Sequence, residues 1–317
     1  MEFLKRVLPL IGVCLFIYLI VKIGVKEIFT KIITANPFYI ILGLFFIIPI
    51  VFFQTLKWYS ILQRQKIKIT FAEAVKLQLI SMFYGAITPA RVGSFIKIAY
   101  LQDRLKNFGK AASSVVIDRA FDMLTVLLFA GMGTLILINQ IPQMALFVFV
   151  VFIAFMIFFM LLISKNNGQK IVRFLYEKLL PKSIKKRTRK SFKDFYLSIP
   201  KKRQLVIPFL LNIVAWIVIY TQIFIVAKAI NVKVSYFVII FMFPIATIIG
   251  EIPVTIGGLG IREASLIGLL GLFGVAADSV MSISIISLVI TNIIPSVTGM
   301  ILAATGYSIN KRTKKKK

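Results

Sequence analysis

The sequence predicts an all-α membrane protein, a polytopic helical bundle that contains two broken, re-entrant helical hairpins. Apolar residues make up 59% of the 317 residues, which exceeds the roughly 45–50% found in soluble domains. Apolar stretches long enough to cross a hydrocarbon core of about 30 Å recur along the whole chain between short polar joints. The formal net charge of +28 must therefore lie mainly in the joints, and an ordinary cytosolic enzyme is excluded.

The histidine and cysteine content restricts the chemistry open to the chain. There is no histidine, which excludes Ser-His-Asp and Cys-His catalysis and His-ligated zinc. The single cysteine, Cys14, lies in an apolar run and cannot form a disulfide framework or a cysteine metal cluster. The sequence also lacks a P-loop motif, so ATP-driven pumping is not expected. No cofactor and no resident metal are predicted.

Six apolar stretches are predicted to cross the membrane as helices. The first follows Lys5 and Arg6, as in a signal peptide, but no A-x-A cleavage pattern precedes Lys22, so a retained helix is expected. The six stretches are residues 7–21, 38–56, 112–138, 141–163, 207–230 and 279–303. They predict a single integral membrane domain over residues 1–317, with two halves at residues 1–163 and 207–303.

Lysine and arginine in the joints predict the orientation, because positively charged loops stay in the cytoplasm. Residues 164–206 hold fourteen of them, which predicts a basic cytoplasmic loop that touches anionic lipid rather than nucleic acid. The basic tail 304–317 and the joint 57–70 are cytoplasmic by the same rule, and the uncharged joint 139–143 is external. The expected location is the cell membrane, with both termini in the cytoplasm.

The first predicted hairpin covers residues 71–101. This stretch begins and ends at basic cytoplasmic joints, so it crosses the membrane an even number of times or turns back within it. It breaks at residues 88–93 (TPARVG), and each arm is shorter than the roughly 20 residues of a full span. A re-entrant hairpin that enters from the cytoplasm is therefore expected.

The second predicted hairpin covers residues 235–277 and breaks at residues 252–260 (IPVTIGGLG). The last span must end in the cytoplasm. This stretch therefore either enters as a hairpin from outside or forms two short spans that meet on the cytoplasmic side. Counting membrane crossings leaves both arrangements open.

Broken helices in the two halves of a membrane protein are typical of a substrate site. At the first break, Thr88 suits an N-cap and Pro89 a first helical residue. A half-helix is expected to restart there, with free N–H groups inside the membrane and Arg91 in its first turn. A helix N-terminus and a guanidinium together favour a phosphate or a carboxylate ligand.

The second break also combines residues that permit a sharp turn with an arginine at the start of the next helix. Three glycines permit backbone conformations that other residues avoid, and Arg262 begins the helix that follows them. The glycines are Gly257, Gly258 and Gly260. A second anion site similar to the first is therefore expected.

Carboxylates accompany both breaks. Asp118 and Asp122 are four residues apart and share one helical face beside Arg119, while Glu251 and Glu263 flank the second break. Intramembrane charges are costly and mark a transport or binding pathway, although buried ion pairs that fix helix packing are the alternative. The expected charges balance at five against five: Lys76, Arg91, Lys97, Arg119 and Arg262 against Glu73, Asp118, Asp122, Glu251 and Glu263.

Residues 88–93, 117–122 and 251–263 resemble, in order and spacing, the lysylphosphatidylglycerol synthase transmembrane region, also called the flippase-like domain or UPF0104 family. The resemblance covers essentially the whole chain. It implies a membrane region that moves charged lipid across the bilayer. In larger family members a separate soluble domain performs aminoacyl transfer. No such domain follows residue 310, so the chain is expected not to be an enzyme.

The chain departs from the family pattern at three positions. Ser94 stands where an acidic residue is frequent, Asp118 where glutamate is frequent and Ile256 where proline is frequent. The first departure removes a carboxylate from the neighbourhood of Arg91. An uncharged or anionic headgroup, such as a glycolipid or a polyprenyl phosphate, is therefore favoured over a cationic lysyl-lipid.

The leading hypothesis is a translocator that moves an anionic or charged lipid between leaflets, such as a phospholipid or a polyprenyl-phosphate-linked lipid. One alternative is a membrane-embedded lipid or sugar-phosphate transferase in which Asp118 and Asp122 hold Mg²⁺. Another is a non-catalytic membrane partner of a cytosolic glycosyltransferase. The predicted substrate-binding residues are Thr88, Arg91, Gly93, Asp118, Arg119, Asp122, Glu251, Thr255, Gly257, Gly258, Gly260, Arg262 and Glu263.

Overall fold

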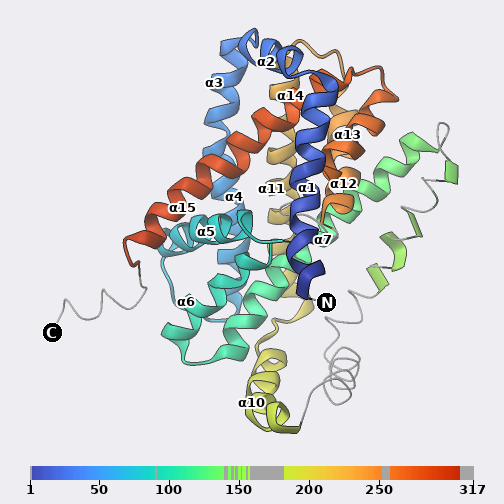
Figure 1. The fold of residues 1–317 in the computed structure, drawn as a ribbon. Coiled ribbons are helices and arrows are strands. Elements are labelled where there is room, and N and C mark those ends of the chain that lie inside the picture. The colour runs from blue at the N-terminus through green and yellow to red at the C-terminus, as the bar shows by residue number, and fades with distance from the viewer. Residues whose placement is uncertain are drawn as a thin grey trace.

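The computed structural model describes residues 2–89, 91–138, 182–251 and 258–307, with short pieces between residues 142 and 157. These residues form helices and the turns between them, and no strand occurs among them (Figure 1). By length and composition, four of the described helices can cross a membrane: Pro37–Arg64, Phe108–Leu137, Lys202–Ala229 and Ala277–Ala304. The prediction of an all-α membrane bundle is confirmed.

The long helices match five of the six predicted spans and mostly extend beyond them. Their bounds are α1 Glu2–Ile23, α3 Pro37–Phe45 with α4 Ile47–Arg64, α7 Phe108–Leu137, α11 Lys202–Ala229, and α14 Ala277–Leu288 with the π-helical segment η2 Val289–Ile293 and α15 Ile294–Ala304. Side-chain caps fix two of the starts, because Asn36 accepts from Phe38 N at 3.0 Å and Asn107 accepts from Lys110 N at 2.9 Å. The predicted span 141–163 lies largely outside the described residues.

The predicted joint 57–70 is wrong in its first half. Helix α4 continues without interruption to Arg64, and both Lys57 and Trp58 are buried. The positive-inside rule assigns lysines to loops, but Lys57 is paired with carboxylates of α7 and so remains inside the bundle. Only residues 65–70 connect α4 to the next helix.

The first broken hairpin is present as predicted. It consists of α5 Phe71–Ala86, the short 3₁₀ helix η1 Val92–Phe95 and α6 Ile96–Leu105. Thr70 and Glu73 form a reciprocal capping box that starts α5. Glu73 also meets Arg104 near the end of α6, with 3.2 Å between Oε2 and Nη1, so the two arms begin and end at the same place.

The second stretch also forms a hairpin, of α12 Tyr236–Gly250 and α13 Ile261–Gly271. The residues that precede and follow it, Asn231 and Asp278, line one pocket together with α2 Val25–Ile33. Lys31 of α2 reaches Asp278 with 3.8 Å between Nζ and Oδ2. The hairpin therefore starts and ends at the α2 end of the bundle, as both predicted arrangements require.

The two hairpins enter the bundle from opposite ends. Helices α3 and α4 form one rod of 28 residues, about 42 Å long at 1.5 Å per residue. At one end, beside α2, Asn36 N donates to Ala229 O at 2.7 Å. At the other end, Gln65 Nε2 donates to Ser198 O, at the end of α10 Lys182–Ser198. Figure 1 shows α2 and α10 at opposite ends of the molecule, with α5 and α6 toward the α10 end.

The predicted basic loop 164–206 contains an ordered helix. Helix α10 packs against α7, where a Cβ on Gly109 would lie 2.1 Å from Ser191 O, and Asn107 Nδ2 donates to Asp194 Oδ2 at 3.1 Å. Phe192, Phe195 and Tyr196 give this helix an apolar face that joins a core cluster, although its overall composition is basic. The described end of the chain follows α15, and residues 308–317 lie outside it.

Candidate functional site

The tips of the two hairpins meet in the middle of the bundle. Arg91, at the first break, lies 3.9 Å from Glu251, at the second, measured from Nε to Oε1. Both side chains are 36% exposed, so the pair remains accessible. Arg91 Nη2 also donates to Asn292 Oδ1 at 3.4 Å, from the π-helical segment η2. A π-helical insertion inside an α-helix is common at functional sites, and here it carries the amide that reaches Arg91.

The local geometry of the first break differs from the prediction. Thr88 and Pro89 do not start a half-helix, because they lie in a turn that precedes the left-handed residue Arg91, at φ 53°. The N–H groups that follow are already bonded: Arg91 N to Thr88 O, Val92 N to Pro89 O and Gly93 N to Thr88 Oγ1. Among the described residues of this break, the predicted free backbone donors are already bonded, so the guanidinium of Arg91 remains as the donor for an anion.

Gly93 has a steric role at the first break. A Cβ at this position would lie 2.1 Å from Tyr84 O, closer than two non-bonded atoms can approach. The Thr88 hydroxyl donates to the same carbonyl at 2.8 Å while it accepts from Gly93 N. Thr88 and Gly93 therefore hold the chain that leaves the break against the end of α5, and this contact fixes the position of Arg91 between them.

At the second break, Thr255 and Gly257 lie outside the described residues. Gly258 and Gly260 have positive φ angles of 78° and 83°, as their predicted backbone role requires. Gly260 also allows contact with α1, because a Cβ there would lie 2.4 Å from Gly12 O. These glycines shape the turn and are not themselves placed as ligand contacts.

Glu263 has a structural role. Its Oε2 accepts from Gly260 N at 2.6 Å at the start of α13, and its Oε1 accepts from Ser284 at 2.8 Å. Arg262 Nη2 donates to the same Oε1 at 2.7 Å and to Ser284 Oγ at 3.1 Å. Glu263 is fully buried, so the packing alternative holds for this carboxylate. Arg262 remains 17% exposed.

Three arginines share the region where the tips meet. Arg119 and Arg262 lie close enough to Arg91 for their charges to act on it, as does Glu251. Arg119 also interacts with Glu251. These four residues, Arg91, Arg119, Glu251 and Arg262, are named here the tip cluster. They come from both hairpins and from α7, and the two breaks meet through Arg91 and Glu251.

A second group of charges was only partly predicted and is buried except for Asp122, which is 17% exposed. Asp118 lies 3.1 Å from Lys97 and 3.3 Å from Lys57, measured between carboxylate oxygen and Nζ. Asp122 also contacts Lys57 and accepts from Trp216 Nε1 at 3.2 Å. The predicted shared face of Asp118 and Asp122 is correct, since both contact Lys57. The inner cluster is Lys57, Lys97, Asp118 and Asp122.

Lys97 and Asp118 are the most enclosed of these charges, and Lys97 has further partners. It is fully buried, its Nζ donates to Gln78 Oε1 at 2.6 Å, and it lies 4.3 Å from the centre of the Trp58 ring. Arg119 links the inner cluster to the tip cluster, because its Nη1 lies 3.5 Å from Asp122 Oδ2. Lys57 and Lys97 were missed as site residues. A lysine at a helix end and one near a break carry no sequence signal that separates them from interfacial lysines.

The charge balance inside the bundle changes as a result. Glu73 pairs with Arg104 at the base of the first hairpin, and Lys76 lies over the Tyr307 ring, so neither belongs to the central set. Lys57 joins it. The two clusters and Glu263 then contain five cations and four carboxylates: Lys57, Arg91, Lys97, Arg119 and Arg262 against Asp118, Asp122, Glu251 and Glu263. The predicted neutral set is replaced by one with a surplus of one positive charge.

Cations already surround the two aspartates that were considered for metal binding. Lys57 contacts both, Lys97 contacts Asp118, and Arg119 lies 3.9 Å from Asp118 and 3.5 Å from Asp122. In the described part of the chain, no group of three or more histidine, cysteine, aspartate or glutamate side chains is placed to hold a metal ion. The aspartates act as counter-ions for lysine and arginine.

The fold and the charges thus define a class of integral membrane bundle in which two opposed broken hairpins meet at a basic centre. Residues 7–299 match the family model described as the lysylphosphatidylglycerol synthase TM region, and the chain belongs to this family. It is similar to a UPF0104 membrane protein of Methanothermobacter thermautotrophicus, at 23% identity over 94% of this chain and 92% of that one. A second protein of that name and organism is 26% identical over 82% and 83% of the two chains. A UPF0104 membrane protein of Pyrococcus horikoshii is 21% identical over 94% and 96%.

Proposed function

We propose that the chain translocates a lipid with a phosphate-bearing headgroup between the two leaflets of the cell membrane. The observation that carries the proposal is the meeting of two oppositely inserted hairpin tips at Arg91 and Glu251, 3.9 Å apart. Broken helices that meet near the middle of a bundle are the usual setting of a transport site, because each can open toward one side of the membrane. The site then alternates between the leaflets.

The tip cluster suits a phosphate. The Arg91–Glu251 distance of 3.9 Å exceeds a hydrogen bond, and both side chains are partly exposed. Such a pair is held weakly, and an incoming phosphate oxygen can replace Glu251 as the partner of the guanidinium. Arg119 and Arg262 act on the same space, and the central set carries one surplus positive charge. An anionic headgroup would complete the charge balance.

The inner cluster supports the site without binding the lipid. Lys57, Lys97 and Asp118 are buried, and a buried charge is tolerated only when it is paired and hydrogen-bonded. Asp122 contacts Lys57 and Arg119, so the cluster fixes the position of Arg119 between α4, α7 and the hairpin tips. Because three cations neutralise Asp118 and Asp122, we favour translocation over metal-dependent transfer chemistry. Transport without a nucleotide motif is downhill or coupled to an ion.

The orientation follows from the basic segments. We place α10 and both termini in the cytoplasm, since α10 and residues 164–206 hold many lysines and arginines. The first hairpin then enters from the cytoplasm, and the second enters from the α2 end on the outside. The lipid would thus be handed between a cytoplasmic hairpin and an external one.

The proposal is tested in vesicles that contain the purified protein and a trace of fluorescent lipid, with the outer leaflet bleached by a membrane-impermeant reductant. Phosphatidylglycerol, phosphatidic acid and a polyprenyl phosphate are compared. Protein-dependent exchange of at least one of them is expected, with a rate reduced about tenfold or more in Arg91→Gln, as for loss of a charged hydrogen bond worth about 1.5–3 kcal/mol. Arg64→Gln is the matched control, because within the described part of the chain Arg64 donates to Ser60 O at the end of α4 and to no carboxylate. Exchange no faster than in protein-free vesicles for every lipid would contradict the proposal.

A further inference from the structure

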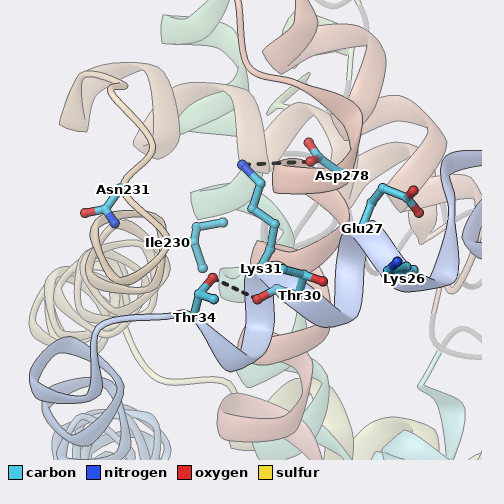
Figure 2. A pocket seen from close by; sticks show the side chains of 8 residues that line it. All are labelled: Lys26, Glu27, Thr30, Lys31, Thr34, Ile230, Asn231 and Asp278. Carbon is cyan, nitrogen blue, oxygen red and sulfur yellow. Dashed lines mark hydrogen bonds and ion pairs between the residues drawn. The ribbon is translucent and has the colours of Figure 1, made fainter.

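A polar depression lies far from the hairpin tips, at the end of the bundle where the second hairpin begins and ends. Its volume is about 600 Å³, and its walls come from one face of α2, the end of α11 and the first turn of α14 (Figure 2). Two lysines and two carboxylates line it, Lys26 and Lys31 with Glu27 and Asp278. It shares no residue with the tip cluster or the inner cluster.

Helix α2 has three distinct faces. Ile28 is buried against α14, where Ser282 Oγ approaches Ile28 O at 3.4 Å. Val25, Phe29 and Ile33 are spaced by four residues, so they form one stripe, and they are exposed by 58%, 61% and 65%. The charged face lines the depression. A short helix with an exposed apolar stripe beside a charged face lies in the plane of the membrane surface, with the stripe in the acyl region.

That placement brings the depression to the level of the lipid headgroups. If the stripe of α2 sits among the acyl chains, the lysines on the neighbouring face stand in the headgroup layer. The depression therefore opens toward lipid headgroups of the leaflet at the α2 end. A headgroup is the ligand that this location supplies at high concentration.

The charges of the depression are available to a ligand. Lys31 extends across it toward Asp278 (Figure 2), but the 3.8 Å between Nζ and Oδ2 is too long for a hydrogen bond. The two side chains are 39% and 24% exposed, so the pair is weak and exchangeable. Lys26 makes no ion pair with the described residues. With two positive and two negative groups, the depression matches a ligand that carries both signs.

We propose that this depression binds the headgroup of a zwitterionic phospholipid. The phosphate lies between Lys26 and Lys31, and the ammonium group of the headgroup lies toward Glu27 and Asp278. The bound lipid links α2 to the base of the second hairpin, since Asp278 follows that hairpin directly. Binding here does not depend on the transport site, because the two places share no residue.

The test uses a fluorophore on a single cysteine. Thr34→Cys is made in a Cys14→Ser background, because Thr34 lines the depression and its hydroxyl donates to the Thr30 carbonyl one turn earlier in the chain. The labelled protein in detergent is titrated with dihexanoyl phosphatidylethanolamine, with dihexanoyl phosphatidylglycerol and with inorganic phosphate. A saturable response to phosphatidylethanolamine is expected, with at least tenfold weaker responses to the other two.

The variants that test the site are matched in charge. Lys26→Ala with Lys31→Ala is expected to weaken the phosphatidylethanolamine response at least tenfold, and Asp278→Asn to remove the preference over phosphatidylglycerol. Lys22→Ala with Lys228→Ala is the control, because these lysines lie over the Tyr18 and Phe224 rings outside the depression.

Three outcomes would overturn the inference: no saturable response, an equal response after loss of Lys26 and Lys31, or an equal response to inorganic phosphate. Arg91→Gln is expected to leave this binding unchanged. A failure at this site is therefore distinguishable from a failure of the transport proposal.

Discussion

The tip cluster and the inner cluster consist of the same kinds of side chain, yet they differ in burial and in contact. The Arg91–Glu251 pair is 36% exposed at 3.9 Å, whereas Lys97 and Asp118 are fully buried at 3.1 Å, with Gln78 as a further partner. A weak exposed pair can exchange partners at little cost, but a buried pair cannot lose one partner without leaving an isolated charge. The comparison assigns ligand exchange to the tips and structural support to the interior.

The largest expected effect is the loss of one buried partner. Lys97→Met removes a cation from Asp118, whose Oδ1 already lacks a hydrogen bond, and should cost about 3–5 kcal/mol of stability. The measurement is the midpoint of unfolding in detergent. Lys97→Met combined with Asp118→Asn removes both charges of the pair, leaves Lys57 with Asp122, and should recover most of the loss. Equal stability of Lys97→Met and the wild type would remove the distinction between the two clusters.

The backbone of the first break should be nearly as sensitive. Gly93→Ala places a methyl group 2.1 Å from Tyr84 O, so the turn that carries Arg91 must shift, at a cost of about 1–3 kcal/mol and with slower transport. Gly268→Ala in α13 is the matched control, because its added methyl meets nothing within 4 Å. The control should change stability by less than about 1 kcal/mol. Both are compared by thermal unfolding and in the vesicle assay. Equal stability and equal transport rates of the two alanine variants would mean that the turn accommodates the added methyl group without cost.

A smaller effect is expected from the acidic partner at the tips. Glu251→Gln removes an exposed pair, so stability should change by less than about 1 kcal/mol. The exchange rate should stay within about threefold of the wild type, because Arg91 remains to hold the phosphate. If stability instead falls as far as in Lys97→Met, the tip pair is structural as well.

The smallest effect lies outside the membrane segments, where α10 docks on α7. Burial raises the pKa of Tyr196 to about 12. The folded chain therefore holds the phenol proton more tightly than the unfolded chain, so this contribution is complete below about pH 10 and is lost as the pH rises to about 12. Unfolding of Tyr196→Phe should depend less steeply on pH over that interval. Identical slopes for the two proteins would show that the phenol does not contribute.

The sequence predicts the spans well because they depend on composition over long stretches. Apolar runs such as residues 207–230 and 279–303 must form helices in lipid, since the backbone has no other way to satisfy its hydrogen bonds. Both hairpins followed from the same reasoning. Whether the second stretch turns back inside the bundle or crosses it twice did not follow, because counting crossings gives the same result for both; its tip residue Glu251 meets Arg91 of the opposite hairpin.

The site was predicted less completely, because residues that pair in the folded bundle can lie far apart in the sequence. Arg91, Arg262 and the aspartates of α7 stand near visible breaks or lie within apolar helices, so their types alone mark them. Lys57 was assigned to a joint because its partners lie about 60 residues away on α7. The free N–H groups expected at the first break were not found, because the turn bonds those of Arg91, Val92 and Gly93 internally. Hydrogen bonds within such a turn depend on φ angles that sequence patterns do not determine.

The central claim is that Arg91 binds the lipid headgroup and does not merely pair with Glu251. The measurement that tests it most directly is the rate of lipid exchange in vesicles that contain Arg91→Gln combined with Glu251→Gln. Both charges of the pair are then absent, so a purely structural pair leaves no unpaired group behind. The account predicts a rate still at least about tenfold below the wild type in a protein that unfolds at the same temperature. A rate equal to the wild type would contradict it.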